Sequence, residues 1–302
     1  MSYKLTIFTP TYNRADTLER LYESLKAQKI DHSLFEWLIV NDGSKDNTDE
    51  IVNLFINENV LNIRYYKQEN RGKQSAWNFA VMNSNSVLFC CVDSDDRLHD
   101  AEVLSLILTK YYEKLLNDKD LVGIRALTVS SKTLKPSGKA IATSGKNLSY
   151  FEEIADNSII GERIDILKTK IIKNYLYPVQ NDIKFIPEIW FYVTVAKDGY
   201  KFLYVPDILG FFYDETEVNR LTRSSIKMHA KGHYISRSNA LKFTPIFTWL
   251  RNPIFWIKTL VRFSQTAMYT QKKINERIRD TNIIYALLSY PFGLIKLGFG
   301  EK

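Results

Sequence analysis

Short apolar runs alternate with longer amphipathic segments over the first 93 residues of the chain. The runs are largely apolar and are expected to be strands, at 4–10, 35–42, 62–68 and 86–93. The segments between them begin with polar residues and are expected to be helices, at 14–28, 44–58 and 72–84. In the first helix, Asp16 or Thr17 is expected to be the cap. Continuous apolar strands separated by helices predict an α/β fold with a parallel sheet covered on both faces.

Polar segments follow three of the expected strands, at 10–13 (PTYN), 41–44 (NDGS) and 93–96 (DSDD). Ligands bind outside the carboxyl ends of the strands in such a sheet, so the three segments are expected to line one edge. Each of the first two segments, taken alone, is also an ordinary turn sequence, because Asn and Asp tolerate turn geometry and Gly supplies positive φ.

The third segment is less easily explained as a turn, since it places Asp93, Asp95 and Asp96 within four positions. Like charges at the end of a buried strand are unfavourable unless a positive group lies beside them. A hard divalent cation with oxygen ligands, also bound by substrate phosphates, supplies that charge. Together the three segments predict a nucleotide diphosphate site with a metal.

Four blocks resemble the family 2 glycosyltransferases with the GT-A fold, in order and spacing over about the first 100 residues: TIFTPTYNRADTLERLYESLKAQ, FEWLIVNDGSKDNTDEIV, NRGKQSAWNFA and VDSDD. The resemblance implies a Rossmann-like, mostly parallel sheet and an inverting transferase that uses a nucleotide-activated sugar, with UDP the expected nucleotide. It also implies Mg²⁺ or Mn²⁺. One departure is Asn41, where many relatives have a second Asp. Asn also accepts hydrogen bonds, so the expectation stands.

Carried over by position, the resemblance implies that Asp95 is the metal ligand of a DxD motif. The donor-binding residues that it implies are Pro10, Tyr12, Asn13, Asp42, Lys73, Asn78, Asp93, Ser94 and Asp96. Pro10 and Tyr12 would flank the base, and Asp42 would hydrogen-bond it. Lys73 would lie near the nucleotide or sugar, in a pocket shaped by Asn78. Asp93 would lie near the ribose, and Asp96 would bond to the donor sugar or hold the loop.

Inverting transfer is a single displacement, so a base must take the proton of the acceptor hydroxyl. Three candidates lie beyond residue 100, namely Asp165, Asp182 and Glu188. Glu188 follows Pro187 and precedes an apolar Ile-Trp-Phe-Tyr run, which fits the start of a helix in the family's acceptor-side segment. Glu188 is therefore the expected base and Asp182 the second choice, while Asp165 is expected to position the acceptor.

The NRLTRSS segment offers Arg220 and Arg223, with hydroxyls nearby. A guanidinium matches phosphate geometry, which makes Arg223 a candidate diphosphate contact, although a solvated charged loop is nearly as consistent with the sequence. His229 and His233 are four residues apart, a spacing compatible with a metal on a helix. Without a third ligand in view, surface histidines are expected there.

The positive charge of the chain is concentrated at its C-terminal end. Residues 226–302 hold 13 Lys and Arg against three acidic residues, a balance of +10, while residues 1–225 hold 28 basic and 31 acidic residues, a balance of −3. We therefore expect a GT-A catalytic domain at 1–225, with a nucleotide half at 1–100 and an acceptor half at 101–225. A helical extension is expected at 226–302.

The extension mixes aromatic and aliphatic residues with Lys and Arg, as do helices that lie on an anionic membrane. Packing on the catalytic domain or on another copy in a homo-oligomer is the alternative. Nucleic acid is not an expected partner, because it would leave the apolar surface unexplained. The membrane interpretation fits a lipid-linked oligosaccharide acceptor in cell-surface polysaccharide synthesis, such as capsule.

Cellular location is inferred from three features of the sequence. The N-terminus lacks the pattern of a signal peptide, and no stretch reaches 18 uninterrupted apolar residues. Cys90 and Cys91 are adjacent and fit a reducing compartment. We expect a cytoplasmic protein, peripheral at the cytoplasmic face of the plasma membrane.

Two alternative functions were considered. The first is a sugar-nucleotide-binding scaffold subunit with weak catalysis. The second is a dehydrogenase, which would need a G-x-G-x-x-G turn that the first loop lacks.

Overall fold

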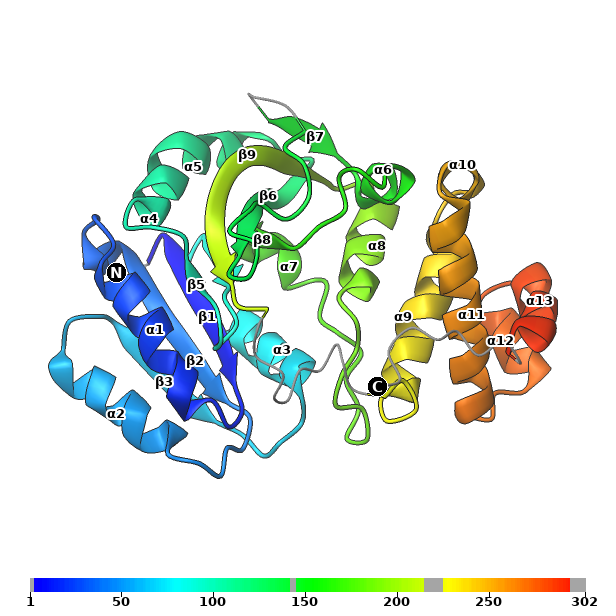
Figure 1. Cartoon of the computed structure of the whole chain (residues 1–302), viewed down its shortest axis with the longest axis horizontal. Helices are drawn as coiled ribbons and strands as arrows, with labels where there is room; N and C mark the ends of the chain where they lie inside the picture. Colours follow the sequence, from blue (N-terminus) through cyan, green and yellow to red (C-terminus); the bar gives the residue numbers. More distant parts are fainter. Residues whose placement is uncertain (1–2, 142–144, 215–224, 294–302) are drawn as a thin grey trace. The chain divides into compact units, whose positions relative to one another are not determined.

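The computed structural model describes residues 3–141, 145–214 and 225–293 of the chain, with side chains up to residue 291 (Figure 1). Contacts divide the chain into two compact units. Unit 1 comprises residues 1–148, 158–176 and 201–216, and unit 2 comprises 149–157, 177–200 and 217–302. Residues 177–200, which we expected in the acceptor half, group with the C-terminal helices. The domain division at residue 225 stays a prediction.

Unit 1 is built on one nine-stranded sheet in the order β3-β2-β1-β4-β8-β6-β9-β5, with β7 paired to β9 (Figure 1). Strands β1 to β4 are parallel, while β8 runs antiparallel between β4 and β6. The strands are β1 (Leu5–Thr11), β2 (Phe35–Asn41), β3 (Ile63–Lys67), β4 (Leu88–Cys91), β5 (Arg97–Leu98), β6 (Leu121–Ser130), β7 (Lys146–Leu148), β8 (Arg163–Lys168) and β9 (Lys201–Phe212).

Helices cover both faces of the parallel part of the sheet. Leu5 and Ile7 of β1 join the core that also contains the buried faces of α1 and α2. Phe8 points to the other face, where it stacks on Phe89 and Trp77 of α3 meets Phe89 edge-on. The helices of unit 1 are α1 (Ala15–Lys26), α2 (Thr48–Glu58), α3 (Lys73–Asn83), α4 (Val103–Leu106), α5 (Tyr112–Asn117) and α7 (Thr169–Ile172), with a 3₁₀ turn at His32–Leu34 and a π turn at Ile107–Tyr111.

The predicted cap of the first helix is wrong. Helix α1 begins at Ala15, so Asp16 and Thr17 lie inside its first turn. The Ala15 amide donates to the Asp46 carboxylate over 3.1 Å, and the Thr17 hydroxyl donates to the Ser94 carbonyl over 2.7 Å. A carboxylate distant in the sequence satisfies one of the orphan N–H groups of the helix, which no local pattern could reveal.

Unit 2 is helical, as predicted for the C-terminal extension. Its helices are α6 (Tyr150–Ala155), α8 (Ile189–Lys197), α9 (Ala230–Phe243), α10 (Ile246–Arg251), α11 (Pro253–Tyr269), α12 (Ile274–Asp280) and α13 (Ile283–Gly293). Helix α9 passes so close to the preceding chain that a Cβ at Gly232 would lie 1.7 Å from the Phe185 carbonyl oxygen. Aromatic residues of α9, α10 and α11 form the core, among them Tyr234, Trp249 and Phe263.

The expectation of surface histidines is also wrong. His229 and His233 both meet the Phe185 ring edge-on, and His229 is 9% exposed. Burial lowers the pKa of His233 to about 3, helped by the positive groups of Arg237, His229 and Arg262. Among the described residues, no helix is both long and apolar enough to cross a bilayer.

Candidate active site

The three polar segments meet at one edge of the sheet, as predicted. In the register of the parallel pairs, Thr11 at the end of β1 lies beside Asn41 at the end of β2, and Phe8 lies beside Cys91 at the end of β4. Strand order reverses at β1, since β2 and β3 lie on one side of it and β4 on the other. Such a switch point is where open α/β sheets bind ligands.

The acidic cluster after β4 is compact. Asp93, Asp95 and Asp96 each offer a carboxylate oxygen within 4.8 Å of the others. Burial, together with the charges of Asp93 and Asp95, raises the pKa of Asp96 to about 8. The Tyr213 amide donates to Asp96 over 3.0 Å and opposes this shift. Three oxygen donors that repel one another fit a hard divalent cation such as Mg²⁺ or Mn²⁺.

Two basic side chains lie against this cluster. The Lys73 ammonium, at the first residue of α3, donates to Asp93 over 2.9 Å. Arg14 lies 3.5 Å from an Asp95 oxygen, and both side chains are 16% exposed. The cluster therefore combines oxygen ligands for a cation with cationic groups that suit a phosphate. Ser94 is buried between these acids, and its carbonyl accepts the Thr17 hydrogen bond.

Asp42 anchors the loop that leads into α3. Its carboxylate accepts hydrogen bonds from the Arg71 amide (2.8 Å), the Gly72 amide (2.8 Å) and the Gln68 side chain (2.7 Å). Gly72 has φ 92, a left-handed conformation that favours glycine, so this loop brings Lys73 toward the acids. A carboxylate has about four acceptor positions, and the described residues use three of those on Asp42. Base recognition by Asp42 stays a prediction.

Asn41 and Asn13 serve the scaffold. The Asn41 amide donates to Asp49 (2.9 Å) and to the Tyr65 hydroxyl (2.8 Å), and its oxygen accepts from the Ser44 amide. Asn13, at φ 52, accepts from the Lys45 amide over 2.8 Å and so joins the loops after β1 and β2. The Asn41 amide donates to a carboxylate, which the second Asp found in many relatives could not do when ionised.

The remaining expected donor residues lie on the same elements. Tyr12 follows β1 and is 39% exposed, which leaves its ring available to a base. Pro10 is half-buried within β1, and Asn78 is half-buried in the middle of α3. Arg223 lies outside the described residues. The binding roles of all these residues stay predictions.

Sequence reasoning missed Arg14 and Tyr213. Arg14 directly follows the PTYN segment, so its position was a usable signal. Tyr213 follows β9, 117 residues from the Asp96 to which its amide donates, and the Arg20 guanidinium stacks on its ring at 3.6 Å. No local spacing in the sequence links these residues.

The candidates for the base fall on different units. Glu188 lies in unit 2 at the N-cap position of α8 and is exposed, and its carbonyl accepts from the Phe191 amide. Asp182, also in unit 2, is exposed and paired with Lys231, whose hydrogen bond lowers the pKa of Asp182. Asp165 lies in β8 of unit 1, 3.2 Å from the buried Arg125, so its charge is already compensated within the sheet.

Comparison with known proteins agrees with this geometry. Residues 6–133 match the family described as Glycosyl transferase family 2. A teichoic acid poly(glycerol phosphate) polymerase from Staphylococcus epidermidis is 33% identical over 120 residues, which cover 39% of this chain and 16% of the relative. The chain thus corresponds to only a small part of that relative's length.

Solved structures show the fold over nearly the whole chain. TarS 1–349 of S. aureus, in complex with UDP-GlcNAc, has a TM-score of 0.68 at 16% identity, covering 96% of this chain and 91% of that one. The mannosyltransferase PcManGT of Pyrobaculum calidifontis, with GDP-Man and Mn²⁺, has a TM-score of 0.59 at 13% identity, covering 97% and 88%.

The strand order and the likeness to these solved structures define a fold of the GT-A class, as predicted. More specifically, residues 6–133 are the part of the chain that matches glycosyl transferase family 2.

Proposed function

We propose that this chain is an inverting glycosyltransferase that moves a sugar from a nucleotide diphosphate sugar to an acceptor hydroxyl. The observation that carries the proposal is the carboxylate cluster of Asp93, Asp95 and Asp96, flanked by Lys73 and Arg14 at the switch point of a family 2 domain. UDP is the proposed nucleotide, supported by the UDP-GlcNAc complex of TarS.

The residues of unit 1 would bind and orient the donor. Tyr12 and Pro10 would flank the base, with the Tyr12 ring 39% exposed, and Asp42 would hydrogen-bond the base. Asp95 would hold Mg²⁺ or Mn²⁺, with Asp93 and Asp96 beside it, and the bound ion would neutralise charge on the departing diphosphate. Lys73 and Arg14 would add positive charge there, and we include Arg223 as a further diphosphate contact.

Glu188 is the proposed base. It would take the proton of the acceptor hydroxyl while that oxygen bonds to the anomeric carbon and the bond from this carbon to the diphosphate breaks. Its exposed position at the start of α8 supports this role. Asp182 is a poorer candidate, because its pairing with Lys231 lowers its pKa and weakens it as a base.

We propose a lipid-linked oligosaccharide acceptor in cell-surface polysaccharide synthesis. The similarity of residues in this chain to a teichoic acid poly(glycerol phosphate) polymerase supports a polymer of the cell surface. A lipid-linked acceptor would place the enzyme at the cytoplasmic face of the plasma membrane.

Exposed apolar residues of unit 2 support membrane association. On α10 and α11, Leu250 is 74% exposed, Ile254 is 61% exposed and Arg251 lies beside them in the chain. Helix α13 exposes Ile283 and Leu287, four residues apart. Apolar side chains next to basic ones suit the headgroup region of an anionic bilayer.

Flotation with phosphatidylglycerol-containing liposomes tests the membrane proposal. Leu250→Glu and Ile254→Glu should reduce the bound fraction, since each places a carboxylate in the apolar face. Leu54→Glu is the matched control, because Leu54 is 59% exposed on α2 in unit 1. Equal flotation of all three variants would contradict the membrane proposal. A shift in mass from dimer to monomer in the Leu250→Glu and Ile254→Glu variants would replace the membrane with a second copy.

Release of nucleoside diphosphate tests the enzymatic proposal. The full chain, incubated with a panel of nucleotide sugars and Mn²⁺, should slowly hydrolyse its donor. Asp95→Asn should abolish this release, while Asp198→Asn, an exposed change after α8, should not alter it. Donor binding without turnover for any acceptor would instead favour the scaffold subunit. If no donor binds and Asp95→Asn changes nothing, the proposal is wrong.

A further inference from the structure

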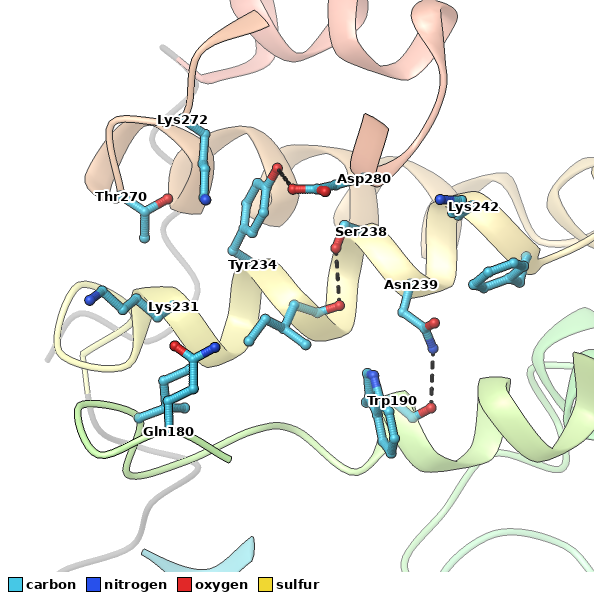
Figure 2. A pocket seen from close by; sticks show the side chains of 13 residues that line it. Gln180, Trp190, Lys231, Tyr234, Ser238, Asn239, Lys242, Thr270, Lys272 and Asp280 are labelled. Carbon is cyan, nitrogen blue, oxygen red and sulfur yellow. Dashed lines mark hydrogen bonds between the residues drawn. The ribbon is translucent and has the colours of Figure 1, made fainter. Parts of the chain in front are cut away.

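Unit 2 contains an open groove of about 620 Å³ (Figure 2). One wall is helix α9, and the other parts come from the segment before α8, the first turn of α8, and the turn between α11 and α12. Trp190 and Gln180 line it opposite α9. Trp190 lies two residues after Glu188, so the wall of the groove begins in the helical turn that also carries the proposed base.

The groove combines aromatic surface with fixed polar groups. The Trp190 ring packs against Tyr177 at 5.3 Å between centroids, which fixes the orientation of the indole. The Asn239 amide donates over 3.1 Å to the Trp190 carbonyl (Figure 2) and over 3.1 Å to the Thr194 hydroxyl, so its oxygen is preorganised as an acceptor. Ser238 also lines the groove, and its hydroxyl donates to the Ile235 carbonyl over 3.1 Å, which leaves its oxygen to act as an acceptor. A flat indole beside amide and hydroxyl groups suits a sugar ring, which has an apolar C–H face and a polar edge.

Three lysines line the groove, and they differ in their partners. Lys231 is paired with Asp182, and Lys272 donates to Glu276 over 2.8 Å. Lys242 instead donates to the Arg279 carbonyl over 2.9 Å, and within the described residues it has no ion pair with a carboxylate. The Lys242 ammonium retains donors for an anionic group.

The groove also holds one carboxylate whose charge is already compensated. Asp280 accepts from the Tyr234 hydroxyl over 2.9 Å (Figure 2). It also accepts from the Arg279 guanidinium over 3.0 Å. This leaves the Lys242 end as the positive part of the groove, with Trp190 and Asn239 nearer its middle in the view of Figure 2.

We propose that this groove binds an acidic oligosaccharide chain, and that it holds the part of the acceptor distant from the reacting hydroxyl. Sugar rings pack on Trp190 and bond to Asn239 and Ser238, and a carboxylate or phosphate of the chain binds Lys242. The role as an acceptor subsite rests on the proposed glycosyltransferase function. Binding energy from such a remote part of the substrate can be used to lower the barrier of the transfer step.

Direct binding to the full chain tests the proposal without turnover. The probes are fluorescently labelled tetrasaccharides, one neutral and built of N-acetylhexosamine, the other with alternating uronates. The uronate probe should bind more tightly. Lys242→Glu should weaken it about tenfold or more, the effect of losing a charge-assisted hydrogen bond, and should affect the neutral probe less. Trp190→Ala should weaken both probes.

Lys227→Glu is the matched control, because Lys227 is exposed in unit 2 and does not line the groove. Lys242 is exposed, so Lys242→Glu should fold, and it still tests the proposal if Trp190→Ala does not fold. The proposal is overturned if wild-type protein binds neither probe, if both lysine variants behave alike, or if the chain binds phosphatidylglycerol vesicles through Lys242 but no tetrasaccharide.

Donor hydrolysis by the same preparations separates the two proposals. If the wild-type protein hydrolyses a nucleotide sugar but binds no tetrasaccharide, the groove proposal is wrong and the transferase proposal stands. If tetrasaccharide binding depends on Lys242 but no donor is bound or hydrolysed, the groove binds a glycan and the transferase proposal is wrong.

Discussion

Lys73 donates a hydrogen bond to Asp93 over 2.9 Å, which ties the start of α3 to the loop after β4. The ammonium offsets part of the repulsion among the acids and would lie beside a bound diphosphate. We expect Lys73→Met to raise the Kd of UDP about 10- to 150-fold, because a hydrogen bond to a charged group contributes about 1.5–3 kcal/mol. Calorimetric titration with UDP and Mn²⁺ measures this. Lys29→Met, which removes a 70% exposed side chain, is the control, and an unchanged Kd for Lys73→Met would contradict the assignment.

Substitution of the buried Asn41 is expected to change the stability of the fold. Its amide donates to Asp49 and Tyr65, so Asn41→Asp would lose both hydrogen bonds and bring two carboxylates together. We expect the free energy of unfolding to fall by about 1–3 kcal/mol, the cost of unsatisfied buried polar groups. Urea unfolding measures it, with the exposed Asn53→Asp as control.

A second change distinguishes this explanation from general damage to the core. Asp49→Asn in the Asn41→Asp background restores one donor and one acceptor between the two positions, so it should recover part of the lost stability. A double variant that is no more stable than Asn41→Asp would mean that the pairing is not the cause.

These residues also show how far the sequence alone could go. Periodicity located β1 to β4 and α1 to α3, because the apolar positions of each element are local in sequence. The edge location of Asp42, Asp93 and Asp95 followed from parallel strand order alone. The partners of these acids did not follow, since Asp42 anchors the loop at 68–72 and Asp96 accepts from Tyr213, contacts that depend on tertiary folding.

Errors in the sequence predictions have the same origin. Asp46 supplies the hydrogen bond at the start of α1 from a separate loop, so the local cap at Asp16 or Thr17 was the wrong choice. His229 and His233 were expected at the surface because the sequence showed no third metal ligand beside them. They are packed instead, since the Phe185 ring reaches α9 from another part of unit 2.

Substitutions of Glu188 and Asp182 are expected to have different effects on kcat. Glu188→Gln keeps the size of the side chain but removes the base, so we expect kcat to fall about 10²- to 10⁴-fold with the donor Kd unchanged. Asp182→Asn should leave kcat near the wild-type value, because Asp182 is exposed, paired with Lys231 and weakened as a base by that pairing. Transfer of a radiolabelled sugar to the acceptor measures both. The reverse ranking would assign the base to Asp182.

The buried His233 is expected to make the stability of the protein depend on pH. Burial, with the positive groups of Arg237 from α9, His229 before it and Arg262 from α11, lowers its pKa to about 3 in the folded protein. The unfolded chain, with an ordinary His pKa of about 6.5, therefore binds the proton first as the pH falls. This contribution to stability is complete above about pH 6.5 and is lost from there toward about pH 3, at up to about 1.4 kcal/mol per pH unit.

His233→Gln removes this titration, so its unfolding free energy should decline less steeply than that of the wild type between about pH 6.5 and pH 4. Urea unfolding followed by circular dichroism measures the slope, and amide exchange in α9 assigns it to unit 2. His32→Gln, a change in unit 1, is the control for histidine loss in general. If His233→Gln and the wild type show parallel slopes over this range, His233 is not neutral in the folded protein, and the packing against Phe185 does not control its protonation.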